Sequence, residues 1–199
     1  LHDKTVGVVG TGHIGAALVK LLSGFGCRIL CYDPYPNDAL KALGAEYTDL
    51  STLLSTSHII SLHCPLNEDS HHLINQQTLD SMRDGVMLIN TSRGGLIDSR
   101  AVIKALKTHK LGYLGLDVYE MESELFFRDH SSEIIQDDVF ERLATFHNVL
   151  ITGHQGFFTI EALGQIAEVT LENMIGFSNG FKQPFANEAA PETRFLIIP

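Results

Sequence analysis

Short apolar runs alternate with helical patterns along most of the chain. Runs rich in β-branched residues predict strands, because such side chains fit a pleated, buried surface. Between these runs, apolar residues return every three or four positions, which is the spacing of a helix with one buried face. The predicted strands span residues 5–9, 28–32, 58–62, 86–90, 112–118 and 149–152. The predicted helices span residues 14–24, 49–55, 75–83, 98–108, 137–145 and 160–178.

The order of these elements indicates an α/β protein with a doubly wound parallel sheet. The strands are almost continuously apolar, as is typical of strands that are covered on both faces. Asp49, Asp98 and Asp137 stand where three of the helices begin and are good N-cap residues. We therefore predict one α/β domain over residues 1–158 and a C-terminal helix and tail over residues 159–199.

Composition and charge limit the classes of function. The chain has 199 residues, enough for one domain with an ordinary core. Its formal net charge is −10 and it has no run of Lys and Arg, so we expect no nucleic-acid partner. No apolar run reaches the roughly 18 residues of a membrane span and no signal-peptide pattern is present, so we expect no membrane contact and a cytoplasmic location. The three cysteines lack the spacing of a metal site, and we expect no metal.

A glycine motif follows the first predicted strand. Gly10, Gly12 and Gly15 form the pattern G-x-G-x-x-G directly after that strand and open the next helix. Gly10 permits a tight turn, Gly12 lets a pyrophosphate approach the backbone, and Gly15 lets the helix press against the strand. The N–H groups at the start of the helix then face the phosphates. The motif therefore indicates a dinucleotide-binding domain of the Rossmann type.

Asp33, at the end of the second strand, bears on the choice of cofactor. Its carboxylate can accept hydrogen bonds from the adenosine ribose hydroxyls and would repel a 2′-phosphate. The residues that follow, Pro34, Tyr35 and Pro36, provide no cation for such a phosphate. We therefore predict NAD rather than NADP. A methyltransferase is the alternative at this point, because that class also combines a glycine-rich loop with an acid after the second strand.

Arg93, Glu122 and His154 follow the fourth, fifth and sixth predicted strands. In a doubly wound sheet of order 3-2-1-4-5-6, the carboxyl ends of those three strands share one edge with the glycine loop. We therefore expect the three side chains to converge at the nicotinamide end of the dinucleotide. Asp117, at the end of an apolar strand, is a further functional candidate, because an unpaired acid is costly there.

These residue types fit hydride transfer at a 2-hydroxy acid. A guanidinium binds a carboxylate through two parallel hydrogen bonds and can polarise a 2-keto carbonyl. An imidazole titrates near cellular pH and can exchange a proton with the hydroxyl group, and a neighbouring carboxylate stabilises its charged form. We assign Arg93 to substrate binding, His154 to proton transfer and Glu122 to orienting the imidazole. Glu120 and Glu124 remain alternatives to Glu122.

Six segments of the chain together resemble one enzyme family. The segments GTGHIG, DPYP, LHCPL, NTSRGGLID, LGLDVYE and TGHQ, in this order, are similar to those of the D-isomer-specific 2-hydroxyacid dehydrogenases, and among them to the fermentative D-lactate branch of bacteria. The resemblance implies that Arg93 binds substrate, that Glu122 orients the imidazole, and that His154 donates the proton when pyruvate is reduced. It also implies that NAD is contacted by His13, Ile14, Asp33, Cys64, Pro65, Thr91, Ser92 and Asp117.

The same resemblance suggests the substrate and the extent of the chain. The long connection between Glu122 and His154 is similar to the D-lactate branch, which favours pyruvate and D-lactate. The family inserts its cofactor domain into a substrate domain, which is largely missing here, so we expect a truncated chain that binds NADH but is inactive alone. We expect the enzyme to be a homo-oligomer. The alternatives are another D-2-hydroxyacid dehydrogenase and a non-catalytic, NAD-sensing interaction module of the same fold.

Overall fold

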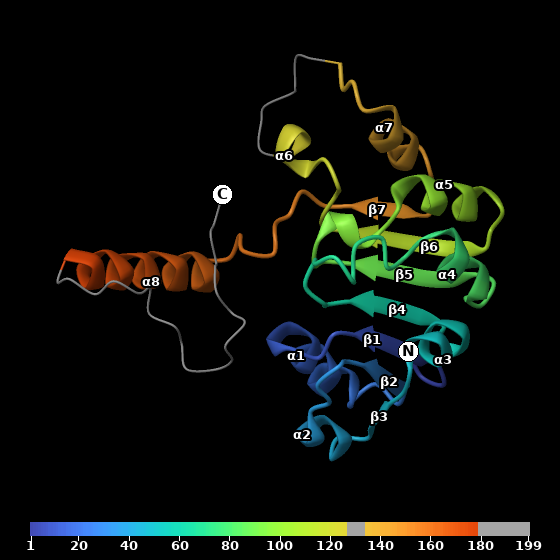
Figure 1. The fold of residues 1–199 in the computed structure, drawn as a ribbon, viewed down its shortest axis with the longest axis horizontal. Coiled ribbons are helices and arrows are strands. Elements are labelled where there is room, and N and C mark those ends of the chain that lie inside the picture. Colours follow the sequence, from blue (N-terminus) through green and yellow to red (C-terminus); the bar gives the residue numbers. More distant parts are fainter. Residues whose placement is uncertain (127–133, 179–199) are drawn as a thin grey trace. The chain divides into compact units, whose positions relative to one another are not determined.

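The structure, a computed structural model, describes residues 1–126 and 134–178. Contacts divide the chain into two compact units, the first ending at Gln155 and the second beginning at Gly156. The first unit contains a parallel sheet with the strand order β3-β2-β1-β4-β5-β6-β7 (Figure 1). This sheet confirms the α/β, doubly wound prediction.

The predicted strands and helices are all present, with ends that differ from the prediction by at most two residues. The strands are β1 Thr5–Val9, β2 Arg28–Tyr32, β3 Ala45–Tyr47, β4 Ile59–Leu62, β5 Val86–Asn90, β6 Leu111–Leu116 and β7 Val149–Ile151. The helices are α1 His13–Leu22, α2 Asp38–Lys41, α3 Leu50–Thr56, α4 Gln76–Ser81, α5 Ser99–Lys107, α6 Glu122–Leu125, α7 Asp138–Ala144 and α8 Ile160–Ser178, with a 3-10 turn, η1, at Gly94–Leu96.

One strand was missed, and this changes the place of another. The strand β3 has three residues, none of which is β-branched and one of which is a glutamate, and it pairs with β2 at the edge of the sheet. The predicted third strand, now β4, pairs instead with β1. Its expected position beside β2 was therefore wrong. The prediction that the last three strands lie side by side is confirmed, because β5, β6 and β7 are neighbours.

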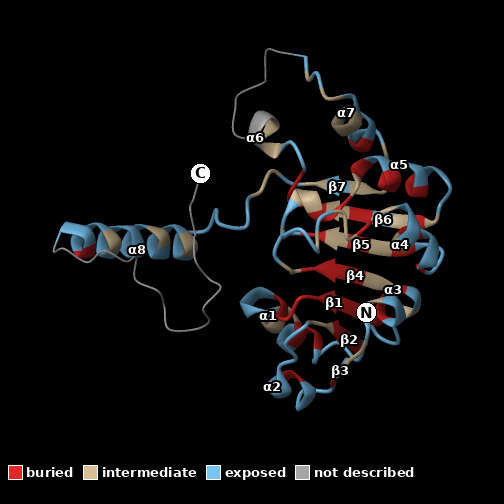
Figure 2. Ribbon diagram, viewed as in Figure 1, coloured by how far each residue is buried: buried red, intermediate tan, exposed pale blue. Residues whose placement is uncertain are grey.

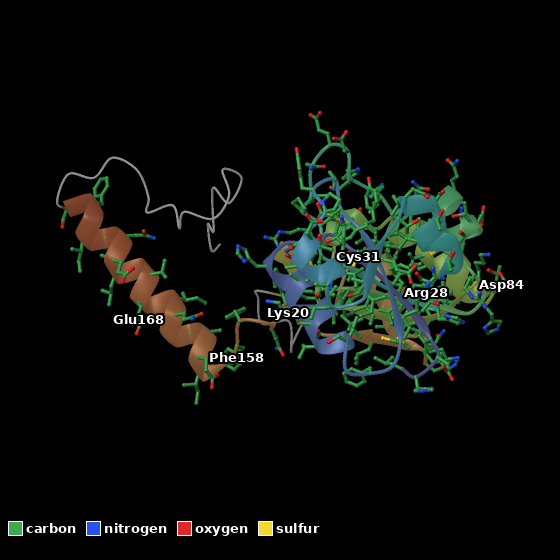
Figure 3. All side chains as sticks on the ribbon, turned by 90° about the horizontal axis from the view of Figure 1, so that it is seen from below. Lys20, Arg28, Cys31, Asp84, Phe158 and Glu168 are labelled. Atoms are coloured by element: carbon green, nitrogen blue, oxygen red, sulfur yellow. The ribbon has the colours of Figure 1, made fainter. Side chains whose placement is uncertain are left out.

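Both faces of the sheet are covered, because successive residues of a strand point to opposite sides. Ile29 and Cys31 of β2 pack into one core cluster with Val19 of α1. Leu30, which lies between them, packs into the other cluster with Leu53 of α3. Figure 2 shows the central strands as the buried middle of this unit, and Figure 3 places Cys31 among its crowded interior side chains.

The predicted N-caps are also present. The side chains of Asp49, Asp98 and Asp137 each accept hydrogen bonds from backbone N–H groups two or three residues further along the chain. These bonds satisfy donors that the first turn of a helix leaves without an intrahelical acceptor. The caps fix where α3, α5 and α7 begin.

The second unit is described up to Ser178. Its helix α8 spans the residues that the sequence predicted, and polar side chains such as Glu168 extend from it into solvent (Figure 3). The predicted tail after this helix lies outside the described residues. No helix in the described ranges is both long and apolar enough to cross a membrane.

Candidate active site

The glycine loop between β1 and α1 is built around close backbone contacts. Gly10 has a φ of 90°, and a Cβ there would lie 2.5 Å from the backbone nitrogen of Cys64. A Cβ at Gly15 would overlap the carbonyl oxygen of Gly10. Both positions therefore require glycine for the packing of the chain itself.

Gly12 is different, because the chain leaves open space around it. It is exposed, forms the N-cap position of α1, and a Cβ there would meet no described atom within 4 Å. The packing of the chain therefore does not require a glycine here. A pyrophosphate that lies directly against the backbone would require one, so this position fits a dinucleotide.

The start of α1 offers the charge that a phosphate needs. His13 and Ile14 are exposed in its first turn, and Gly12 provides no side-chain cap. The first N–H groups of a helix have no intrahelical acceptor and carry the positive end of its dipole. An anion at this position would accept hydrogen bonds from those N–H groups, which is the role that the sequence analysis assigns to them.

Asp33 is held directly beside the glycine loop. Its Oδ2 accepts hydrogen bonds from the backbone nitrogen of Thr11 at 2.6 Å and from the Thr11 hydroxyl at 3.0 Å. Its Oδ1 accepts from the backbone nitrogen of Tyr35 at 2.8 Å. A carboxylate has about four acceptor sites, so capacity remains for a ribose hydroxyl.

A residue that the sequence did not point to supports this arrangement. The hydroxyl of Tyr47, in β3, donates to Thr11 Oγ1 at 2.9 Å. It also accepts from the backbone nitrogen of Asn37 at 3.0 Å. Tyr47 therefore ties the glycine loop to the segment that follows Asp33, and it was missed because β3 was not predicted.

The loops after β4 and β5 are joined to each other. The hydroxyl of Ser92 donates to the carbonyl oxygen of Cys64 at 2.7 Å, and Pro65 and Thr91 are exposed next to these residues. Burial, together with the charge of Asp33, raises the pKa of the Cys64 thiol to about 11. Cys64 is therefore a neutral thiol near pH 7, which suits a residue that packs against a ligand and not a nucleophile.

Arg93 is presented by a fixed backbone. Asn90, which is 1% exposed, donates from Nδ2 to the carbonyl oxygen of Arg93 at 2.8 Å and accepts from the backbone nitrogen of Ser92 at 3.1 Å. The guanidinium donates to the carbonyl oxygen of Ser92 at 2.8 Å, and the residue is exposed. The end of β5 therefore places the positively charged side chain of Arg93 at the carboxyl edge of the sheet.

His154 and Glu122 meet at the same edge. His154 Nδ1 lies 3.0 Å from Glu122 Oε1, and the two side chains are 32% and 21% exposed. The other oxygen of Glu122 accepts from the backbone nitrogen of Tyr119 at 3.0 Å, which fixes the carboxylate. Glu120 contacts His72 instead, at 2.7 Å, so it is Glu122 that faces the imidazole. The side chain of Glu124 is outside the described part of the structure.

Asp117 holds the turn that carries His154. The sequence predicted a strand over residues 112–118, which would include Asp117. In the structure β6 ends at Leu116, so Asp117 lies just after the strand. Its Oδ1 accepts from the hydroxyl of Thr152 at 2.5 Å and from the backbone nitrogen of Gln155 at 3.1 Å. Its carbonyl oxygen accepts from the backbone nitrogen of His154 at 2.7 Å, where φ is 52°. These bonds hold the imidazole on a backbone conformation that a non-glycine residue seldom adopts.

The open position at Gly12, the acid after β2 and the polar carboxyl edge together define a dinucleotide-binding domain. Residues 1–156 match the model of a family described as "D-isomer specific 2-hydroxyacid dehydrogenase, NAD binding domain". The chain belongs to the D-isomer-specific 2-hydroxyacid dehydrogenase family. The methyltransferase alternative is thereby set aside.

Known proteins similar to this chain are dehydrogenases and reductases of small acids. The D-lactate dehydrogenase of Escherichia coli K12 is 55% identical over 180 residues, which are 90% of this chain and 55% of that protein. The solved pyruvate reductase of Chlamydomonas reinhardtii is 45% identical, with a TM-score of 0.86 over 88% of this chain and 54% of the other. The D-lactate dehydrogenase of Aquifex aeolicus, solved with NAD and lactic acid, is 38% identical, with a TM-score of 0.84 over 89% and 54%. The chain spans about half the length of these relatives.

Proposed function

We propose that this chain is the cofactor-binding part of an NAD-dependent D-lactate dehydrogenase. The observation that carries the proposal is the pairing of Glu122 with His154 at the carboxyl edge of a sheet whose first loop fits a dinucleotide. The similarity to D-lactate dehydrogenases, of which this chain covers about half the length, supports it. NADH, when bound, would supply the hydride that reduces the carbonyl carbon of pyruvate.

The residues that we propose to hold NAD come from five neighbouring segments. The glycine loop and the start of α1 would bind the pyrophosphate, Asp33 would bind the adenosine ribose, and the loops after β4, β5 and β6 would contact the nicotinamide half. The proposed set is Gly10, Gly12, His13, Ile14, Gly15, Asp33, Cys64, Pro65, Thr91, Ser92 and Asp117.

The reaction itself would rest on Arg93, His154 and Glu122. The exposed guanidinium of Arg93 would bind the substrate carboxylate in a two-pronged hydrogen bond and polarise the keto oxygen. His154 Nδ1 faces the carboxylate, so we assign to Nε2 the proton that is donated to the keto oxygen. Glu122 would hold the imidazole in the required tautomer and stabilise its charged form.

We further propose that this activity needs more chain than these 199 residues. A second domain would enclose the substrate from the other side, exclude water and keep the reactants aligned. The isolated chain should therefore bind NADH with a saturable change in fluorescence and should form no lactate. The cytoplasmic location, the homo-oligomeric state and the domain boundary at residue 158 belong to the same proposal.

A panel of 2-keto acids, assayed with NADH and the full-length enzyme, tests the proposal. We expect the highest kcat/KM for pyruvate. A clear preference for a larger or charged keto acid would indicate another D-2-hydroxyacid dehydrogenase. Saturable NADH binding with no turnover of any acid would favour the non-catalytic, NAD-sensing module.

A further inference from the structure

Glu120 lies two residues before Glu122 but has a separate set of contacts. Its Oε1 lies 2.7 Å from Nε2 of His72, and its Oε2 accepts from the hydroxyl of Ser99 at 2.7 Å. The side chains of Glu120 and His72 are 28% and 35% exposed, so the contact is partly shielded from water. One carboxylate therefore joins the loop after β6, the loop that contains His72 and the start of α5.

The same loops also touch through their backbones. A Cβ placed at Gly94 would overlap the Tyr119 carbonyl group and the backbone nitrogen of Glu120. The backbone nitrogen of His72 donates to the carbonyl oxygen of Gly95 at 2.8 Å. The segment that directly follows Arg93 is therefore packed between the two loops that Glu120 joins.

The peptide before Glu120 is anchored on its other side as well. Tyr119 is 5% exposed, and its hydroxyl donates to Oδ2 of Asp137 at 2.8 Å. Its backbone nitrogen donates to Glu122. Burial and the charge of Asp137 raise the pKa of Tyr119, so its hydroxyl keeps its proton. The loop is thus fixed toward α7 by Tyr119 and toward His72 and the start of α5 by Glu120.

We propose that Glu120 is a positioning residue that sets Arg93 at its working distance from the Glu122–His154 pair, by way of Ser99 and His72. The proposal rests on the proposed function, in which Arg93 and His154 act on one substrate molecule at the same time. Such a substrate needs both groups in place, and a misplacement of about 1 Å can reduce the rate about 100-fold. Glu120 does not itself contact the substrate in this scheme.

The test compares two variants of Glu120 with a matched control in the full-length enzyme. Glu120→Ala removes both contacts, whereas Glu120→Gln keeps an acceptor for the Ser99 hydroxyl. The control is Glu68→Ala, which removes an exposed glutamate from a nearby turn. For each variant, kcat and KM for pyruvate, the Kd for NADH and the pH profile of reduction are measured.

We expect Glu120→Ala to lower kcat/KM for pyruvate by about 10-fold or more, because the substrate is no longer aligned. The Kd for NADH should stay within about 2-fold, since the glycine loop does not depend on Glu120, and the pH profile should not move, since Glu122 is intact. Glu120→Gln should recover most of the loss, and Glu68→Ala should behave as the parent. An unchanged kcat/KM, an equal loss in Glu68→Ala, or a shifted pH profile would overturn the proposal.

Hydrogen exchange gives a readout that does not depend on activity. The backbone N–H groups of His72, Leu96 and Ile97 donate to the carbonyl oxygens of Gly95, Arg93 and Gly94, respectively. These N–H groups should exchange faster in Glu120→Ala and not in Glu68→Ala, and unchanged exchange contradicts the proposal.

Two further outcomes keep the positioning role and the proposed function distinguishable. If the full-length enzyme reduces no keto acid, the proposed function fails and the exchange rates alone decide the positioning role. If Glu120→Ala does not fold, Ser99→Ala takes its place. That variant removes the hydroxyl bond to Glu120 and keeps the contact with His72, so the expected loss is smaller, about 3-fold.

Discussion

Replacing Asp33 with alanine tests why this site should prefer NADH over NADPH. Its two oxygens accept three hydrogen bonds, from the backbone nitrogen and hydroxyl of Thr11 at 2.6 and 3.0 Å and from the backbone nitrogen of Tyr35 at 2.8 Å. The variant therefore removes the proposed acceptor for the ribose. It also leaves the donors of Thr11, a residue that is 5% exposed, without their acceptor.

The two losses have different consequences for the two cofactors. An unpaired buried donor costs about 1–3 kcal/mol, which corresponds to roughly 5- to 150-fold in affinity. The unpaired donors of Thr11 loosen the glycine loop, which weakens the binding of NADH and of NADPH alike. The two cofactors differ in the other effects of the variant. NADH loses the ribose hydrogen bonds to Asp33, whereas NADPH is freed from the repulsion between Asp33 and its 2′-phosphate. We therefore expect the ratio of the NADPH Kd to the NADH Kd to fall about 10-fold or more.

Fluorescence titration of both cofactors measures this ratio, and Tyr47→Phe is its control. That variant removes the hydroxyl that donates to Thr11 Oγ1 and leaves the carboxylate of Asp33 in place. It should raise the Kd for NADH and the Kd for NADPH by the same factor. A ratio that is unchanged in Asp33→Ala, or that falls equally in Tyr47→Phe, would refute the reasoning.

Three other predictions concern catalysis and stability. In the full-length enzyme, Glu122→Gln should move the pH profile of pyruvate reduction to lower pH, because the charged imidazole of His154 loses its carboxylate; an unmoved profile would remove Glu122 from the mechanism. Asp98→Ala should lower the free energy of unfolding in urea by about 1 kcal/mol through loss of the α5 N-cap, whereas Asp98→Ser should keep most of it. Burial lowers the pKa of His63 below 6.5, so the unfolded chain binds a proton there more readily than the folded chain. The stabilisation that a neutral His63 gives should therefore be complete above that pH and should decrease as the pH falls below it. Thermal unfolding between about pH 7.5 and 5.5 measures this decrease, which should be smaller in His63→Gln.

The sequence predicted the strands that read as apolar, β-branched runs, including the three-residue β7, and it failed for short elements that lack such a run. Ala45–Tyr47 and Asp38–Lys41 contain too few residues for a periodic pattern. The contact of Tyr47 with Thr11 was therefore invisible in the sequence. The prediction that β4 pairs with β2 was wrong for the same reason. The unrecognised strand β3 occupies that place beside β2, and β4 pairs with β1.

The candidate site shows a similar division. The positions of Arg93, Glu122 and His154 after three neighbouring strands could be predicted, because parallel strands end at one edge. The choice between Glu120 and Glu122 could not, because both follow β6 closely and each finds its partner far away in the sequence. Glu120 meets His72, 48 residues before it, and Glu122 meets His154, 32 residues after it. Only the folded chain separates their roles.

The most direct test of the account is the product formed by the full-length enzyme from pyruvate and NADH. Oxidation of NADH is followed by absorbance, and the lactate is identified with a stereospecific assay. The account predicts one D-lactate for each NADH oxidised, and loss of this reaction in His154→Gln while NADH still binds. Formation of L-lactate, or no oxidation of NADH in the presence of pyruvate, would contradict it.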